Sequence, residues 1–256
     1  MIIAQISDPH LTPRGCLYQG LVDSNALFAA ALRGLADLDP QPDLVLLTGD
    51  VVDKGGEDDY ATARSLLARI GPPLIVMPGN HDEREAFRRC FFDHYYLPAT
   101  GPLHLVRDDL GPVRIVGLDV TVPGEHRGLV DEAAAAWLDA VLARDPARPT
   151  LVMMHQPPFS TGVPYLDDYR CHGADRLAAV LRRYPAVERV LCGHVHRLLC
   201  TAPSTATSIA LSLRPDSEPA SFLEPPAFLL HRWDAATGLV THVVPIGPFP
   251  GPFPFA

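Results

Sequence analysis

Short apolar runs that alternate with helical stretches are the feature that most constrains this chain. Up to about residue 200, each run is rich in Val, Ile and Leu, which is typical of strands buried on both faces of a parallel sheet. N-capping residues begin the stretches between them, and Gly or Pro ends several. The predicted strands are 2–6, 44–47, 74–77, 114–118, 151–154 and 187–192, and the predicted helices are 23–38, 57–70, 83–95, 131–144 and 174–184. The alternation indicates βαβ units and an α/β fold.

The pattern changes after Cys200, where helical periodicity stops and proline becomes frequent. Segments 208–213, 227–232 and 239–244 are predicted to be antiparallel strands, and a Pro- and Phe-rich tail at 248–255 is predicted to be an ordered strap or a frayed end. We therefore divide the chain into a main domain, residues 1–196, and a small C-terminal β extension, residues 197–256, that closes the fold or covers the site.

Composition excludes several classes of protein. The 256 residues suit one large domain or a domain with a small appendage. No apolar run approaches the roughly 20 residues of a membrane-spanning helix, and the first residues do not resemble a signal peptide, so we expect a cytoplasmic protein. A net charge of −9 argues against binding to polymeric nucleic acid. The five cysteines lack CxxC spacing, which favours reduced thiols.

Five polar motifs directly follow five of the predicted strands. Open α/β sheets bind their ligands at the carboxyl ends of parallel strands, so these motifs can converge on one point. Their glycines allow the sharp turns and close backbone approaches that such a point requires. The motifs are Asp8-Pro9-His10, Gly49-Asp50, Gly79-Asn80-His81-Asp82, His155 and Gly193-His194-Val195-His196.

The side chains in these motifs are typical metal ligands. Alone, each motif would more often be a capped turn or a polar strand end, but their joint occurrence at strand ends favours a metal site. Seven ligands exceed the four of a tetrahedral ion and suit two neighbouring ions bridged by a carboxylate. Two divalent ions roughly 3.5 to 4 Å apart are the arrangement used in phosphate-ester hydrolysis. The candidate ligands are Asp8, His10, Asp50, Asn80, His155, His194 and His196.

In this order the motifs resemble the signature of the calcineurin-like metallophosphoesterases, within the branch of class III cyclic nucleotide phosphodiesterases and, most closely, bacterial glycerophosphodiesterases. The likeness spans nearly the whole chain and includes the residues Leu17-Tyr18-Gln19-Gly20, Trp137-Leu138, Gln156-Pro157-Pro158 and Leu229-Leu230-His231-Arg232. The resemblance implies a four-layer α/β/β/α sandwich, in which residues 1–196 form the catalytic domain. It also implies a homodimer or larger homo-oligomer, built through the C-terminal extension.

The resemblance further implies how the ligands divide between two divalent transition-metal ions. One ion would be held by Asp8, His10, Asp50 and His196. The other would be held by Asp50, Asn80, His155 and His194, with Asp50 bridging. Mixed nitrogen and oxygen ligands accept Fe, Mn, Co or Zn. The implied reaction is attack of a metal-generated hydroxide on a small phosphodiester, either a glycerophosphodiester or a 3′,5′-cyclic nucleotide.

His81 is a candidate catalytic residue. Neighbouring side chains at a strand end point in different directions, so His81 is a poor ligand if Asn80 is one. The resemblance places His81 and Asn80 at the substrate phosphate. We expect His81 to stabilise developing charge or to protonate the leaving oxygen, with Asp82 as a second catalytic residue that orients its ring. The alternative for His81 is a purely structural role.

Loops outside the ligand set are expected to select the substrate. Tyr18, which the resemblance also places at the substrate, and segments 159–172 and 201–222 are the candidates. His126 and Arg127 either contact phosphate or belong to a solvated loop. Histidines without a motif are expected in the core or at the surface: His172, His231 and His242.

Three other functions stay open. A phosphomonoesterase and a nuclease share this site, although the acidic balance disfavours a nuclease. A non-catalytic scaffold is disfavoured because every ligand position and His81 are filled. A phosphate-binding P-loop is absent from the sequence, which argues against nucleoside triphosphate hydrolysis.

Overall fold

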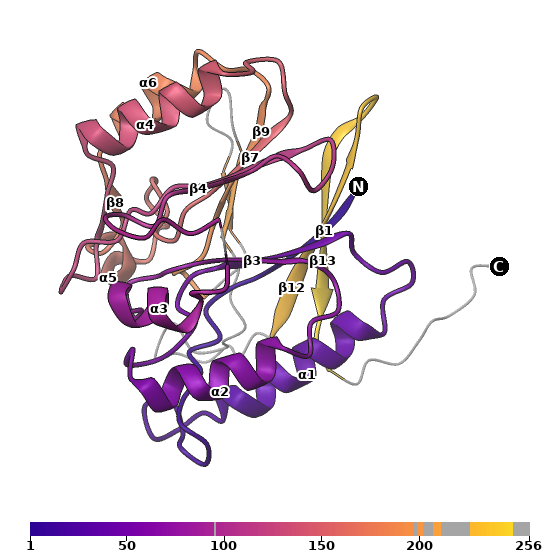
Figure 1. Cartoon of the computed structure of the whole chain (residues 1–256), viewed down its shortest axis with the longest axis vertical. Helices are drawn as coiled ribbons and strands as arrows, with labels where there is room; N and C mark the ends of the chain where they lie inside the picture. The colour runs from indigo at the N-terminus through magenta and orange to yellow at the C-terminus, as the bar shows by residue number, and fades with distance from the viewer. Residues whose placement is uncertain (95, 197–198, 202–206, 211–225, 248–256) are drawn as a thin grey trace.

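The computed structural model describes residues 1–94, 96–196, 199–201, 207–210 and 226–247. Two sheets lie between two pairs of helices (Figure 1). The first sheet has the order β13-β12-β1-β2-β3 and the second the order β10-β11-β9-β7-β5-β4. The first sheet consists of β1 (Ile2–Ile6), β2 (Leu44–Thr48), β3 (Leu74–Met77), β12 (Ala227–Asp234) and β13 (Gly238–Pro245). The second consists of β4 (Leu105–Arg107), β5 (Arg114–Gly117), β7 (Thr150–Met153), β9 (Val187–Cys192), β10 (Leu199–Thr201) and β11 (Thr207–Ala210).

The helices pack on the outer faces of the sheets. In Figure 1, α1 and α2 lie along the first sheet, and α4 and α6 lie on the far side of the second. A separate pair, β6 (Gly128–Leu129) and β8 (Cys171–His172), runs parallel. The helices are α1 (Ser24–Ala36), α2 (Glu57–Leu67), α3 (Arg84–Cys90), α4 (Glu132–Ala143), α5 (Pro164–Asp167) and α6 (Ala174–Leu181).

Alternating side chains on each strand divide the core into three layers. On β2, Val45 and Leu47 join the cluster beneath α1 and α2, whereas Leu44 and Leu46 face the space between the sheets. This is the two-residue period of a strand. On β7, Val152 faces the helices of the second sheet and its neighbours face the first sheet. The continuous apolar runs are therefore buried on both faces, and the predicted α/β/β/α sandwich is confirmed.

The predicted helix at 83–95 is too long. Glu83 caps α3 by accepting the backbone N–H groups of Glu85 and Ala86, but the helix ends at Cys90. Beyond it the chain turns, and His94 N–H donates to Phe91 O. The Tyr96 hydroxyl then accepts the backbone N–H of Val76 on β3 at 3.0 Å. Because this contact brings the chain back to the sheet, the helix cannot continue along its axis.

The C-terminal strands extend both sheets. β12 pairs antiparallel with β1 and with β13, as predicted. The prediction of antiparallel pairing for the strand at 208–213 is confirmed for one neighbour and wrong for the other: β11 is antiparallel to β10 but parallel to β9, because the chain reverses direction between β10 and β11. Residues 211–213, most of the predicted contact segment 201–222 and the tail 248–255 lie outside the described residues. The division at residue 196 and the covering role of the extension stay predictions.

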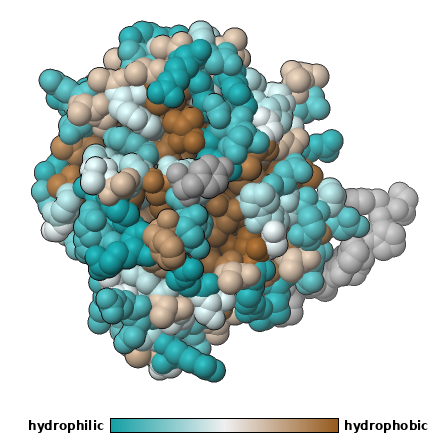
Figure 2. Space-filling model, in the orientation of Figure 1, coloured by the Kyte–Doolittle hydropathy of each residue, from teal (hydrophilic) through white to brown (hydrophobic). Residues whose placement is uncertain are grey.

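No helix in the described part of the chain is both long and apolar enough to cross a bilayer. Figure 2 shows one face of the molecule, where hydrophilic residues surround patches of hydrophobic residues near the middle.

Candidate metal centre

The loops that follow the parallel strands of both sheets meet at one place. The loop after β1 bonds to the loop after β2, with Asp8 N–H donating to Gly49 O at 3.0 Å. The two loops of the second sheet are joined by Gly193 N–H, which donates to His155 O at 2.9 Å. His194 N–H closes the connection between the sheets by donating to both carboxylate oxygens of Asp8, at 2.8 and 3.0 Å. The predicted convergence of the motifs is therefore present.

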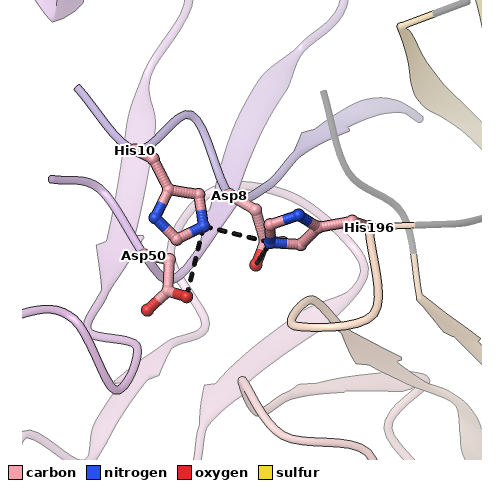
Figure 3. Close-up of side chains that lie close together, drawn as sticks. All are labelled: Asp8, His10, Asp50 and His196. Carbon is pink, nitrogen blue, oxygen red and sulfur yellow. Dashed lines mark hydrogen bonds and ion pairs between the residues drawn. The ribbon is translucent and has the colours of Figure 1, made fainter. Parts of the chain in front are cut away.

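A first cluster of possible ligands contains Asp8, His10, Asp50 and His196, whose ligand atoms lie within 4.8 Å of one another. The Nε2 atoms of His10 and His196 are 3.0 Å apart. His10 Nε2 is 3.5 Å from Asp50 Oδ2, and His196 Nε2 is 3.5 Å from Asp8 Oδ1. Figure 3 shows the rings and carboxylates directed toward a common point. Two imidazole nitrogens and two carboxylates that converge in this way can hold a cation.

A second cluster contains Asp50, His155 and His194. His155 Nε2 lies 3.2 Å from Asp50 Oδ2, while its Nδ1 donates to the carbonyl of Thr48 at 2.8 Å, which orients the ring with Nε2 toward the carboxylate. Asn80 joins this group because its Oδ1 lies 2.9 Å from His194 Nδ1. All seven predicted ligands therefore lie in two clusters that share Asp50.

Two buried ring nitrogens of the second cluster, Nε2 of His155 and Nε2 of His194, have no hydrogen-bond partner among the described residues. Nε2 of His194 makes no hydrogen bond with any described residue, although the side chain is buried. Leaving such a group unsatisfied costs about 1–3 kcal/mol. A chemical partner beside His194 would remove this cost, and the surrounding nitrogen and oxygen atoms fit a divalent cation.

The charges of the site stabilise one another. Burial alone would raise the pKa of Asp50, but the imidazoles of His155, His81 and His10 hold that pKa well below its ordinary value. Burial opposes charge on His155, yet the carboxylate of Asp50 raises its pKa to about 9. Burial, together with the nearby His155, lowers the pKa of His194 well below its ordinary value. His194 is therefore neutral, the form in which imidazole binds a metal.

Backbone strain is concentrated in the candidate ligands. Asp and His tolerate left-handed backbone better than most residues, but each such position still costs of order 1 kcal/mol. In the described part of the chain, one other non-glycine residue, Gln19, has a positive φ. The strained ligands are Asp8 at 53°, His10 at 42°, Asp50 at 49°, His194 at 73° and His196 at 55°.

His81 lies beside the first cluster and is oriented by Asp53. Its Nδ1 is 2.7 Å from the carbonyl oxygen of Asp53 and 3.7 Å from the carboxylate of the same residue. Burial lowers the pKa of His81, but the charge of Asp50 and the contacts with Asp53 raise it overall. The sequence did not single out Asp53, and its one signal is that it follows Asp50 by three residues in the same loop.

The contact expected between Asp82 and His81 is absent from the hydrogen bonds of the described residues. Asp82 Oδ2 instead accepts the backbone N–H groups of Val51, at 3.0 Å, and Gly79, at 2.9 Å. Its Oδ1 accepts the Tyr60 hydroxyl at 2.9 Å. Burial and the charge of Asp50 raise the pKa of Asp82 to about 7. Asp82 thus ties together the loops that carry Asp50 and Asn80, and a direct catalytic role for it stays a prediction.

A cavity of about 310 Å³ opens over the clusters and is lined by His81, Asn80 and the buried Tyr18. The ring of Tyr18 lies 4.7 Å from that of His10. His126 also lines the cavity, with its Nδ1 3.0 Å from Asn80 Nδ2. Its neighbour Arg127 pairs with Glu125. The three histidines expected in the core or at the surface lie outside the cavity: His231 is buried, and His172 and His242 are exposed.

Comparison with known proteins agrees with this geometry. A family model described as "Calcineurin-like phosphoesterase" matches residues 1–198. The chain belongs to the calcineurin-like phosphoesterase family. A family relative from Arcobacter nitrofigilis, named a probable glycerophosphodiester phosphodiesterase GpdQ, is 35% identical over 265 residues, covering 100% of this chain and 97% of the relative. The 3′,5′-cyclic adenosine monophosphate phosphodiesterase CpdA of Escherichia coli K12 is 30% identical over 200 residues, covering 77% of this chain and 70% of that protein.

Solved structures of the calcineurin-like family share the fold. A dimetal phosphatase from Danio rerio superposes with a TM-score of 0.65 at 15% identity, covering 96% of this chain and 99% of that one. GAP50, described as an anchor in the inner membrane complex of Plasmodium, has a TM-score of 0.64 at 13% identity, covering 96% of this chain and 84% of that one. An enzyme and an anchor thus share one architecture, so the function has to be argued from the site.

Proposed function

We propose that this family member is a dinuclear metal-dependent phosphodiesterase that hydrolyses small phosphodiesters. The observation that carries the proposal is the pair of ligand clusters that share the buried carboxylate of Asp50. A shared carboxylate holds two cations at the spacing that phosphoryl transfer uses, because its charge offsets their repulsion.

The division of ligands follows the two clusters. Asp8, His10, Asp50 and His196 would hold one ion, and Asp50, His155 and His194, with Asn80, would hold the other. When bound, two such cations neutralise phosphoryl oxygens and lower the pKa of water. The mixed nitrogen and oxygen donors suit Fe, Mn, Co or Zn.

His81 is positioned to handle a proton at the leaving oxygen. The Asp53 carbonyl accepts hydrogen from Nδ1, so Nε2 is the ring atom that can donate toward substrate. The carbonyl and the carboxylate of Asp53, 2.7 and 3.7 Å from Nδ1, favour the protonated ring that this role requires. Transfer of the Nε2 proton to the departing alkoxide oxygen completes cleavage of the P–O bond and leaves a neutral imidazole. General acids of this kind contribute about 10²- to 10⁴-fold in rate.

Two observations favour small diesters over other phosphate esters. Relatives that match most of this chain are named for glycerophosphodiesters and for cyclic AMP. The chain is acidic overall, with a net charge of −9, while two divalent cations would make the site itself positive. A small anion contacts mainly such a site, whereas a nucleic acid would also meet the net negative charge of the rest of the molecule.

A substrate panel tests the proposal. The metal-reconstituted enzyme is assayed on bis(p-nitrophenyl) phosphate, p-nitrophenyl phosphate, glycerophosphoethanolamine and cyclic AMP. We expect hydrolysis of diesters, loss of at least 100-fold in kcat for Asp50→Ala, and little change for the exposed control His172→Ala. Activity on the monoester alone would establish a phosphomonoesterase, and two bound metals without turnover would establish a scaffold.

The oligomeric state and the cellular location are part of the proposal. We propose a homodimer or larger homo-oligomer in the cytoplasm, on the support of the family resemblance. Light scattering of the purified full chain gives its mass in solution, and a monomer at working concentrations would contradict the assembly.

A further inference from the structure

One wall of the cavity over the metal clusters is a row of aromatic rings. His81, beside the clusters, is followed by His126 at a ring separation of 5.7 Å. Tyr169 lies 5.4 Å from His126, edge to face, and Tyr165 lies 5.2 Å from Tyr169 in the same arrangement. All four rings line the same cavity of about 310 Å³. The row leads away from the reacting centre.

The two tyrosines at the far end of the row, Tyr165 and Tyr169, are not part of the buried hydrophobic core. The side chain of Tyr165 is 65% exposed, although α5, on which it lies, has Leu166 buried beneath it. Neither tyrosine hydroxyl forms a hydrogen bond with any described residue. Single exposed aromatic residues are common, but two in contact on the rim of a cavity form a surface that a ligand can cover.

The segment that carries these rings is fixed by its own hydrogen bonds. The carboxylate of Asp167 accepts the hydroxyl of Thr161 at 2.8 Å and the backbone N–H of Gly162 at 3.2 Å. The carbonyl of His126 accepts the side-chain amide of Gln156 at 2.9 Å. The backbone on either side of the rings is therefore ordered before a ligand arrives, which reduces the entropy that binding would cost.

We propose that Tyr165, Tyr169 and His126 form a stacking subsite for a planar aromatic group, such as a nucleobase, on one arm of the phosphodiester. The inference rests on the proposed function and adds which diesters the site prefers. An aromatic face offers stacking to any flat ring, whereas a glycerol or ethanolamine arm presents no such face. Stacking on a protein ring contributes about 1–3 kcal/mol per base, which corresponds to roughly 5- to 150-fold in affinity.

Paired variants test the stacking surface. Tyr165→Leu combined with Tyr169→Leu removes both rings and keeps apolar bulk, and the corresponding double Phe variant keeps the rings. Phe92→Ala, an exposed aromatic residue outside the cavity, is the matched control. In the metal-reconstituted full chain we expect the double Leu variant to lose about tenfold or more in kcat/KM for cyclic AMP and less than threefold for glycerophosphoethanolamine. The double Phe variant and the control should retain the wild-type ratio.

Two results would overturn the stacking subsite. An equal loss on both diesters would assign the tyrosines a structural role, and the absence of any loss on either diester would show that no ring stacks there. Calorimetry with 5′-AMP and ribose 5-phosphate isolates the contribution of the base: we expect wild-type protein to bind 5′-AMP about tenfold more tightly, and the double Leu variant to lose this preference. Failure of the proposed function is distinct, because wild-type protein would then hydrolyse neither diester.

Discussion

The backbone at the candidate ligands is held in place by glycines that leave room for the carboxylates. A Cβ atom on Gly193 would lie 2.7 Å from Asp8 Oδ2 and 2.9 Å from Thr48 O, both closer than van der Waals contact allows. Asp8 also accepts the N–H of His194, the residue after Gly193. A side chain at Gly193 would therefore displace two ligands at once.

Substitution of this glycine should weaken metal binding. For Gly193→Ala we expect at least a tenfold loss in Mn²⁺ affinity by calorimetry and a loss of about 1–3 kcal/mol in the free energy of unfolding. Gly71→Ala is the control, because a Cβ there meets no atom within 4 Å and its φ is not positive. Unchanged metal affinity in Gly193→Ala would show that the carboxylate of Asp8 can move without loss.

The role of His81 depends on the leaving group. If the ring protonates the departing oxygen, His81→Ala should lose about 10²- to 10⁴-fold in kcat on glycerophosphoethanolamine, whose leaving alkoxide is strongly basic. The loss on bis(p-nitrophenyl) phosphate should be much smaller, because p-nitrophenolate leaves without a proton. Both metals should stay bound, as metal analysis would verify. A uniform loss on both substrates would assign His81 to phosphate binding.

At the level of elements, a polar chain crosses the space between the sheets. His231 on β12 contacts Thr241 Oγ1 at 2.9 Å and Gln5 Oε1 at 3.1 Å. Gln5 donates to Thr48 Oγ1 at 3.0 Å, and the carbonyl of Thr48 accepts from His155. Four neighbouring strands of the first sheet, β13, β12, β1 and β2, are thus linked to a candidate ligand on the second.

Burial of His231 makes the free energy of unfolding depend on pH. Burial, with a smaller contribution from Arg189, lowers the pKa of His231 from 6.5 to about 3. Between these values the unfolded chain binds a proton that the folded chain does not, so stability is lost as pH falls below 6.5. From pH 7 to pH 5 the loss is about 2 kcal/mol. Urea denaturation should show that His231→Gln lacks this component and that the exposed control His242→Gln retains it. Parallel pH profiles for His231→Gln and wild type would contradict the assignment.

The predictability of the elements follows from how local their signals are. The first and last residues of β1, β3 and β9 could be predicted, because a buried apolar run is recognisable from the sequence of the strand alone. The end of α3 and the direction of β11 could not, because each depends on a partner far along the chain. The same holds at the site, where the motifs that carry the ligands could be predicted because they directly follow the predicted strands. The contact of His81 with Asp53 exists only after the loops have folded.

For the molecule as a whole, the candidate ligands connect the two sheets. They extend from Asp8 to His196 and come from both halves of the sandwich. Ions bound there would stabilise the folded chain, which alone assembles the site, by about 2.7 kcal/mol at a hundredfold excess over the dissociation constant. Removal by a chelator should lower Tm by several degrees. Asp50→Ala should show no such shift, and a wild-type Tm indifferent to metal would count against ligands that join the sheets.

The place of β1 in the first sheet has a consequence for synthesis of the chain. This strand lies between β2 and β12, and β12 begins only at Ala227. During synthesis β1 therefore leaves the ribosome well before β12, the strand that covers its open edge. Until then its unpaired N–H and C=O groups can pair with other nascent chains. Synthesis of β12, rather than of the last candidate ligand His196, therefore completes the sheet on which half of the site is built.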